Sequence, residues 1–403
     1  MNILFRYLVA FSMIGINSQQ LFGQHENHAA NQILVNSGFE NVRVKIVGKT
    51  AVVSYENNLL RNKSAGLESV INKLSEFGFD SLRIIILVND LPIITTQFSA
   101  KDWNKNNGQA TTVKGSERHI FGSYNTDSSW GILKNQPAVN SHVNKIDLVF
   151  YPQFSMKNVL LSQLYEVQIN IAPALEVSLW RGMKFTGQVI LPLANHYVFG
   201  EEGDHIRAGF VNLAQEFRLL HSTLGRVVVG RFNLDRYGLD ASVAKYFFND
   251  RAYLKLNGGY TGNYQYRSGE WFRNDLSTVT GFIKGGYFIS SCNLQIDGSF
   301  GRYLNGDSGV RGDCTRYWGE TGIGFFAMVS DGHLNGGFHF AIPIGKKRFK
   351  KNRNFQLRAP SYFDWEYNAG TDSYYGAIYK TQPNESRVEQ FFNPNLIIKN
   401  LLK

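Results

Sequence analysis

The stretch LEVSLWRGMKFTGQVILPL, residues Leu175–Leu193, alternates apolar and polar side chains over most of its length. Successive side chains of a β-strand point to opposite faces, so this stretch has one apolar and one polar surface. Similar stretches recur to the end of the chain, and no apolar run long enough for a membrane-spanning helix follows residue 24. A chain of many two-faced strands is either a soluble β protein or an outer-membrane barrel whose apolar faces lie in lipid.

The first 23 residues are organised like an export signal. One positive charge, Arg6, precedes an apolar core from Leu8 to Ile16, and a polar stretch leads to Gly23. This core is too short to span a membrane, so residues 1–23 are interpreted as a signal peptide.

The composition fits a barrel in an exported protein. Aromatic residues make up 14% of the chain, and there are 39 glycines but only nine prolines. This balance suits long strands with aromatic girdles and glycine bends. The formal net charge of +10 favours acidic partners such as anionic polysaccharide or lipid phosphates. An exported protein rarely meets nucleic acid, so no nucleic-acid partner is expected.

A repeat near the N-terminus predicts a separate small domain. The segment Gly38–Ile46, GFENVRVKI, returns as Gly78–Ile86, GFDSLRIII, and a helical pattern precedes each copy. A second strand follows each copy, so residues 25–103 are predicted to fold as a duplicated αββ unit with two helices on one sheet face. Ahead of a barrel, this α+β domain would lie in the periplasm and dock partner proteins. Residues 104–143 are polar and glycine-dotted, and we interpret them as linker and loops.

Residues 144–385 are predicted to form an antiparallel barrel of about 12–14 strands in a mainly β protein. Several candidate strands reach nine or more residues, enough to cross the hydrocarbon layer, whereas strands of soluble proteins average about five or six. Leu175–Leu193 is interpreted as one long strand with Arg181 near the rim, and a longer, bulged turn there stays open. Residues 386–403 are assigned to a C-terminal tail.

If the apolar side chains face lipid, the opposite side chains line the lumen. The candidates are Glu176, Lys184, Gln188, Glu216, Arg218, Asp240, Asp297, Arg316, Glu320 and His339. Mixed charges of this kind usually pair across a small barrel and fill it. The other interpretation is a hydrated path that contacts sugar hydroxyls.

A basic run near the end of the chain is either a solvated turn or a contact for acidic glycan or lipid phosphates. Its members are Lys346, Lys347, Arg348, Lys350, Lys351 and Arg353. The two cysteines are expected on opposite faces: Cys292 with the apolar side chains of its strand and Cys314 inward, if Tyr317–Val329 is one strand. A direct disulfide would then need a bulge, so separate thiols are favoured.

The sequence lacks the motifs of common enzymes. There is no Gly-x-Ser-x-Gly elbow, phosphate loop or zinc-ligand spacing, and the pair Asp204-His205 lies in a probable loop. We therefore predict no catalytic activity, no cofactor and no bound metal. Two alternatives remain. One is an enzyme acting on lipid or glycan through an acid–histidine cluster at one rim, and the other is an adhesive barrel with long loops near 200–204 and 262–273.

Four short segments resemble YjbH-like outer-membrane proteins. They are Gly38-Phe39-Glu40-Asn41-Val42, Tyr55-Glu56-Asn57, Arg236-Tyr237-Gly238-Leu239-Asp240 and Gly337-Phe338-His339-Phe340-Ala341-Ile342-Pro343-Ile344. The resemblance implies an outer-membrane location, a non-enzymatic role in making or exporting exopolysaccharide or capsule, and other polysaccharide secretion proteins as partners. It supplies no catalytic residues. Unlike many outer-membrane barrels, the chain ends Asn400-Leu401-Leu402-Lys403, without a terminal aromatic residue.

Overall fold

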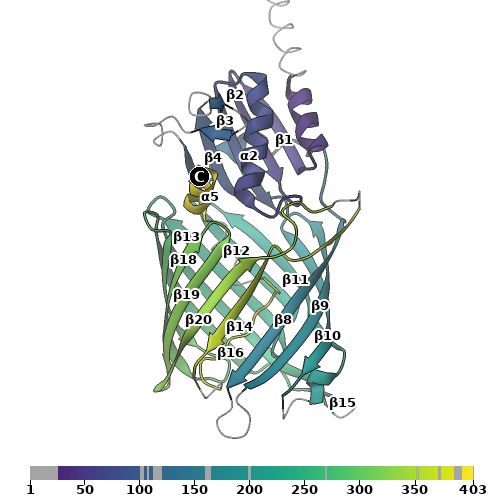
Figure 1. The fold of residues 1–403 in the computed structure, drawn as a ribbon, viewed down its shortest axis with the longest axis vertical. Coiled ribbons are helices and arrows are strands. Elements are labelled where there is room, and N and C mark those ends of the chain that lie inside the picture. The colour runs from purple at the N-terminus through teal and green to yellow at the C-terminus, as the bar shows by residue number, and fades with distance from the viewer. Residues whose placement is uncertain are drawn as a thin grey trace, which may run out of the picture.

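The computed structural model describes residues 26–99, 104–106, 109–111, 120–158, 165–197, 201–267, 270–350, 352, 354–370, 374–384 and 393–402. A small α/β domain sits at one end of a large β-barrel (Figure 1). The predicted signal peptide, residues 1–23, lies outside the described residues. Within the described parts of the chain, no helix has the length and apolarity needed to cross a membrane.

The N-terminal domain is built on a five-stranded sheet in the order β1-β2-β3-β4-β7. Its strands are β1 (Glu40–Val47), β2 (Thr50–Glu56), β3 (Ser81–Val88), β4 (Leu91–Ser99) and β7 (Phe121–Ser123). Strands β2 and β3 are parallel, and the other neighbours are antiparallel. A helix of residues 26–36 and α2 (Lys63–Leu74), which continues into η1 (Ser75–Phe77), pack on one sheet face through one buried cluster. In each αββ unit, a glycine with a positive φ follows the helix and precedes the first strand. These glycines are Gly38, with a φ of 97°, and Gly78, with a φ of 71°.

The interpretation of residues 104–143 as linker and loops was wrong for much of the segment. Besides a short hairpin, β5 (Asn104–Asn106) with β6 (Gln109–Thr111), it contains β7 and α3 (Asp127–Leu133). Helix α3 covers the second sheet face, where Leu133 packs with Val52 and Ile85. These elements are too short for a clear hydrophobic period, and tertiary burial holds them in place.

The barrel sheet has fifteen described strands, fourteen of which follow the path β21-β8-β9-β10-β11-β12-β13-β14-β16-β17-β18-β19-β20-β22. Its first half is β8 (Ile146–Asn158), β9 (Tyr165–Trp180), β10 (Met183–Asn195), β11 (Arg207–Leu219), β12 (Thr223–Arg231), β13 (Arg236–Phe247) and β14 (Ala252–Arg267), which also pairs with β15 (Glu270–Arg273). Its second half is β16 (Thr278–Ile289), β17 (Leu294–Arg302), β18 (Ser308–Trp318), β19 (Thr321–Ser330), β20 (His333–Pro343), β21 (Phe355–Arg358) and β22 (Tyr362–Asn368). A short helix, η3 (Glu201–Asp204), lies between β10 and β11. Phe154 on β8 meets Trp365 on β22 with ring centroids 5.4 Å apart, so the two ends of the sheet come together.

Leu175–Leu193 is a hairpin rather than one long strand. Strands β9 and β10 meet at a tight turn, Arg181-Gly182, in which Gly182 has a φ of 75°. Met183 pairs with Trp180, but Lys184 pairs with Ser178, so one residue of β9 is bulged out. Because a bulge shifts the register by one residue, the apolar side chains of both strands still share the outer face.

The interpretation of Tyr317–Val329 as one strand was also wrong, because β18 and β19 are separated by a turn at Gly319 and Glu320. The turn reverses the expected orientation of β18, so Cys314 is exposed on the outer surface instead of facing inward. Cys292 lies exposed in the turn between β16 and β17. Both thiols are free, and no disulfide joins them.

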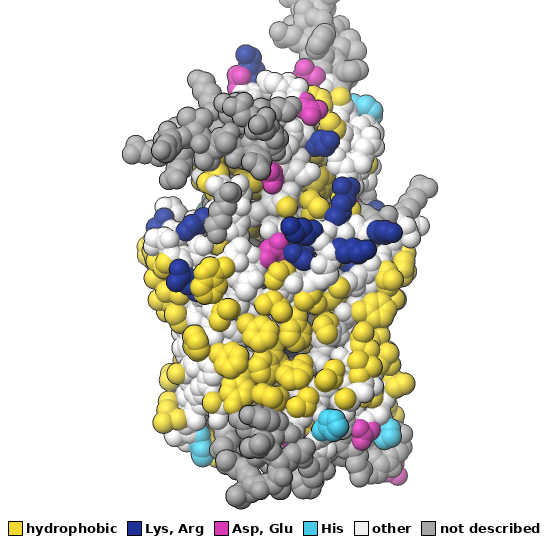
Figure 2. Space-filling view, viewed as in Figure 1, with side chains coloured by type: hydrophobic (Ala, Val, Ile, Leu, Met, Phe, Trp, Pro, Cys, Tyr) yellow, Lys and Arg dark blue, Asp and Glu magenta, His cyan; other side chains and the backbone are white. Residues whose placement is uncertain are grey.

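The outer surface of the barrel carries an apolar belt, and Figure 2 shows it as a yellow band across the face in view. Leu175, Leu254, Ile283, Phe300 and Phe325, from five strands, are between 38% and 67% exposed. Such outward apolar side chains on antiparallel strands, with polar side chains inside, define the outer-membrane type of barrel. The predicted fold class is therefore confirmed.

The chain does not end at the barrel wall. After β22, residues 374–384 run back through the lumen toward the N-terminal domain, and α5 (Pro394–Leu401) then docks beside α2 and β7. We call residues 374–384 the plug. Strand β22, YFDWEYN, is rich in aromatic residues, although the sequence ends in Lys403.

Candidate functional site

The plug is bonded to inward-facing side chains along the length of the barrel. At the end far from the N-terminal domain, Asn305 Nδ2 donates to the carbonyl of Tyr374 at 2.7 Å. Midway, the Tyr379 hydroxyl donates to Asp240 at 2.9 Å, and Asn212 Nδ2 donates to the carbonyl of Thr381 at 2.7 Å. The lumen therefore holds an extended segment of the protein's own chain.

The barrel wall is shaped to receive the plug. Gly259 on β14 faces inward, and a β-carbon there would collide with the Tyr379 hydroxyl. The neighbouring Gly258 faces outward, and a β-carbon there would meet only one atom, the Thr280 carbonyl oxygen, at 4.0 Å. The ring of Tyr379 stacks on Phe232, with centroids 5.4 Å apart. A glycine on the inner face of a strand thus marks the close approach of another segment.

Charged side chains on the inner wall are paired. Glu176 accepts a hydrogen bond from the Tyr151 hydroxyl at 2.6 Å and has Lys184 within 3.6 Å and Arg358 within 3.8 Å. A second group contains Asp297, bonded to the Tyr253 hydroxyl at 2.7 Å. These groups are bonded to one another on the inner wall of the barrel.

The structure brings most of the predicted lumen residues inside. The side chains that face the lumen or its mouth are Glu176, Lys184, Gln188, Glu216, Arg218, Asp240, Asp297 and His339. Arg218 reaches out of the mouth to the carbonyls of Pro92, Ile93 and Tyr124 in the N-terminal domain. The placement of Arg316 in the lumen was wrong. It is exposed on the outer surface, 5.1 Å from the Trp318 ring, because the β18–β19 turn reverses the expected orientation. Glu320 was also misplaced, since it lies in that turn and pairs with Arg61 at 2.7 Å.

A cavity, which we call the vestibule, separates the N-terminal domain from the barrel mouth. The volume of the vestibule is about 240 Å³. Its walls come from the loop after β2, the inner barrel wall, the end of the plug and α5. Gln382 Nε2 and Asn400 Oδ1 are buried there without a hydrogen-bond partner among the described residues.

Helix α5 joins the plug to both parts of the protein. Ser64 on α2 donates to the carbonyl of Ile397 at 2.9 Å. On the barrel side, Lys399 Nζ donates to the carbonyl of Ser290 at 2.6 Å, and Asn400 Nδ2 donates to that of Gly319 at 3.2 Å. Helix α5 therefore contacts both the N-terminal domain and the turns of the barrel.

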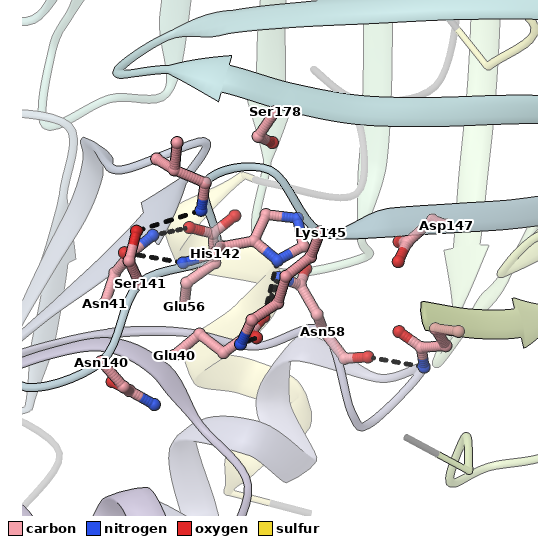
Figure 3. Close-up of polar contacts among 12 residues, drawn as sticks. Glu40, Asn41, Glu56, Asn58, Asn140, Ser141, His142, Lys145, Asp147 and Ser178 are labelled. Atoms are coloured by element: carbon pink, nitrogen blue, oxygen red, sulfur yellow. Dashed lines mark hydrogen bonds and ion pairs between the residues drawn. The ribbon is translucent and has the colours of Figure 1, made fainter. Parts of the chain in front are cut away.

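A buried polar network fastens the N-terminal domain to the start of the barrel (Figure 3). Glu40, at the start of β1, is 1% exposed. One of its carboxylate oxygens lies 2.7 Å from His142 Nδ1, and the other lies 2.5 Å from Lys145 Nζ. Asn58 Nδ2 also donates to Glu40, at 2.9 Å. Beside this group, Glu56 accepts the backbone N–H groups of Asn89 and Asp90.

The network is expected to make the stability of the domain junction depend on pH. Burial alone lowers the pKa of His142, but the hydrogen bond to Glu40 and the charges of Glu56, Glu40 and Asp147 raise it above its ordinary value. A raised pKa in the folded state gives stability that is complete below about pH 6.5 and is lost as pH rises through the folded pKa. We expect urea unfolding of the N-terminal domain to occur at lower urea at pH 8 than at pH 6. His142→Gln should remove that difference, and an equal pH dependence in His142→Gln would contradict this assignment.

An acid–histidine–hydroxyl row occurs inside the barrel, and its histidine and hydroxyl are buried. His339 Nε2 lies 2.8 Å from the Thr315 hydroxyl, and His339 Nδ1 lies 3.8 Å from Asp313. Thr315 is 1% exposed and His339 3% exposed. Arg311 holds Asp313 through three short contacts, the closest at 2.7 Å. Across the described residues, no group of three or more His, Cys, Asp or Glu side chains is arranged to hold a metal ion.

The basic run lies beside the vestibule at the barrel rim. Lys346, Lys347, Arg348 and Lys350 are exposed, whereas Lys351 and Arg353 lie outside the described residues. Leu60 and Arg348 form a β-bridge, and the Phe349 N–H donates to the Leu59 carbonyl at 2.8 Å. The backbone at 347–349 is therefore bonded to the N-terminal domain, while the four described basic side chains are exposed to solvent.

The plug, the vestibule and the buried polar network at Glu40 were not predicted. The signals in the sequence were weak, because Glu40-Asn41 and Glu56-Asn57 stood out only as parts of a family resemblance. For the plug, the available sign was a stretch of small and polar residues after the last strand candidate, which contains three tyrosines, Tyr374, Tyr375 and Tyr379. Its partners, such as Asp240 and Asn212, lie more than a hundred residues away in the sequence.

Comparison with models of protein families and with curated protein sequences gives no match. Two solved structures resemble part of the chain. One is a porin of Rhodopseudomonas blastica, a triple mutant, with 7% identity and a TM-score of 0.28 over 50% of this chain and 91% of the porin. The other is a loop-deletion mutant of OmpT, an outer membrane protein of Vibrio cholerae, with 8% identity and a TM-score of 0.29 over 56% of this chain and 94% of that one. These scores are too low to support an argument, so the assignment as an outer-membrane type of barrel rests on the strand order and the apolar belt.

Proposed function

We propose that the protein is a non-enzymatic component of the outer membrane that assists the export or assembly of an exopolysaccharide or capsule. The barrel lies in the membrane, the N-terminal domain lies in the periplasm, and other polysaccharide secretion proteins dock on that domain. The observation that carries the proposal is the occupied lumen. It accommodates one extended chain, the plug, and it opens toward a vestibule under the N-terminal domain.

Three features support the membrane location and the transport role. The apolar belt matches the surface that a lipid bilayer covers, and export barrels are often closed by an internal segment. The five turns that join consecutive hairpin strands on the side of the N-terminal domain have two to four residues, and the longer β10–β11 and β14–β16 connections lie at the opposite end, as periplasmic turns and extracellular loops do in this class.

The identity of the cargo is tested by deleting the gene and measuring both surface-attached and released polysaccharide. We expect loss of polymer in the deletion strain and recovery when the gene is supplied again. A second strain that supplies the Tyr379→Ala protein tests whether the lumen takes part. Unchanged polymer in the deletion strain, with the protein confirmed in the parent, would overturn the export role.

A further inference from the structure

We propose that the barrel rim next to the N-terminal domain binds the phosphate groups of anionic phospholipids. The side chains concerned belong to the basic run and to three neighbouring turns and strand ends. The exposed cations include Lys245, Arg251, Arg316, Lys346, Lys347, Arg348 and Lys350. Figure 2 shows basic side chains gathered at the boundary between the apolar belt and the N-terminal domain.

The position of these cations relative to the belt points to lipid. The basic run follows directly after β20, whose Ile342 is 40% exposed on the outer surface. Arg316 lies against Trp318, which is itself 49% exposed, as cations and tryptophans do at the depth of lipid headgroups. An acidic polymer in solution would not require this continuity with an apolar surface.

Two carboxylates at this rim, Asp250 and Glu320, already have other partners. Asp250 accepts the backbone N–H of Tyr124 at 2.9 Å, and Glu320 is held by Arg61. At the opposite end of the barrel, exposed carboxylates accompany the exposed cations. Those carboxylates are Asp204, Glu270, Asp275 and Asp331, and the cations there include Arg273 and Arg302. The charge is therefore unequal between the two ends, as expected if each end meets a different leaflet.

The backbone that carries the run is held in place. Phe349 is buried between its exposed neighbours, and the run is bridged to the loop after β2. A fixed backbone keeps the four described cations at one depth, so little ordering is needed when lipid binds. Each Lys or Arg near an anionic surface strengthens the attraction, and the attraction fades within a Debye length.

The test uses the full-length protein in vesicles that contain dibrominated phosphatidylglycerol or dibrominated phosphatidylcholine. Bromine quenches nearby tryptophans, and Trp180 and Trp318 are exposed on the outer surface at this end. We expect brominated phosphatidylglycerol to compete at least about threefold better than phosphatidylcholine at low salt, and the preference to fall at high salt. The double variant Lys346→Glu, Lys347→Glu brings the four described charges of the run from +4 to zero, and it should lose most of the preference.

A matched control reverses two exposed lysines on β1 and the turn that follows it, Lys45→Glu and Lys49→Glu. Both come after Glu40, the residue of β1 that contacts the start of the barrel. This variant should keep the preference. Equal quenching by both lipids in the wild type, or equal loss in both variants, would overturn the proposal. Stronger competition by lipid A or by soluble polygalacturonate than by phosphatidylglycerol would also overturn it.

The inference rests on the proposed membrane location, and the same experiment separates the two. If neither brominated lipid quenches the tryptophans, the membrane location itself fails. If both lipids quench equally, the location stands and only the binding of anionic lipid is lost.

Discussion

Gly259→Ile is expected to open the barrel to ions. The isoleucine side chain would occupy the place of the Tyr379 hydroxyl, which now bonds to Asp240 at 2.9 Å, and would force the plug away from the wall. A barrel of this size leaves an aqueous path once its lumen is not filled by protein. We expect conductance in planar bilayers to rise on the order of tenfold above the wild-type protein, which should be nearly silent.

The matched control is Gly258→Ile, whose side chain points outward into the apolar belt and leaves the plug untouched. It should stay as closed as the wild type. A second variant replaces residues 374–384 by a glycine–serine segment of equal length, which keeps the connection to α5 while removing the contacts of Tyr379 and Thr381. If both opening variants form stable barrels and neither conducts, the lumen is closed by its wall and not by the plug.

Glu40→Ala is expected to cause the largest loss of stability in the N-terminal domain. It removes the carboxylate that binds His142, Lys145 and Asn58, and leaves these partners buried without it. Breaking a buried ion pair on one side typically costs about 3–5 kcal/mol. We expect urea unfolding of the domain to shift to much lower urea, and hydrogen exchange along β1 to become faster.

Glu76→Ala removes an exposed carboxylate from the same domain, so it should change stability by no more than about 0.5 kcal/mol. The barrel of the Glu40→Ala variant should stay folded, as judged by its resistance to denaturation in cold detergent. An unfolding midpoint within the range of Glu76→Ala would show that the network at Glu40 does not hold the junction.

The local features of the fold were predictable, and the long-range ones were not. The alternation from Leu175 to Leu193 is enough for a two-faced strand, because it depends only on neighbouring residues. Arg181-Gly182 and Gly319-Glu320 were the difficult positions. In the first hairpin a bulge keeps the apolar residues at alternate positions on both sides of the turn, so the sequence did not indicate a turn. In the second hairpin the alternation changes at the turn, so the prediction placed Cys314 and Arg316 on the wrong face.

The site depends on contacts between distant parts of the chain. The inward side chains of β9 and β10 followed from parity, so Glu176 and Lys184 were found, and the structure pairs them at 3.6 Å. Nothing in the neighbourhood of Tyr379 indicates that it bonds to Asp240, or that residues after the last strand return through the lumen. Such contacts form only when the barrel has closed, and they join residues that are far apart in the sequence, so local sequence patterns do not predict them.

The two native cysteines allow the most direct test of the account. Cys292 lies exposed in a barrel turn beside the N-terminal domain, and Cys314 lies on the belt that should face lipid. A membrane-impermeant maleimide should label neither thiol on intact cells, Cys292 alone once the outer membrane is permeabilised, and both after the protein is extracted into detergent and unfolded. Labelling of Cys292 on intact cells would contradict a periplasmic N-terminal domain, and labelling of Cys314 before extraction would contradict a barrel embedded in lipid.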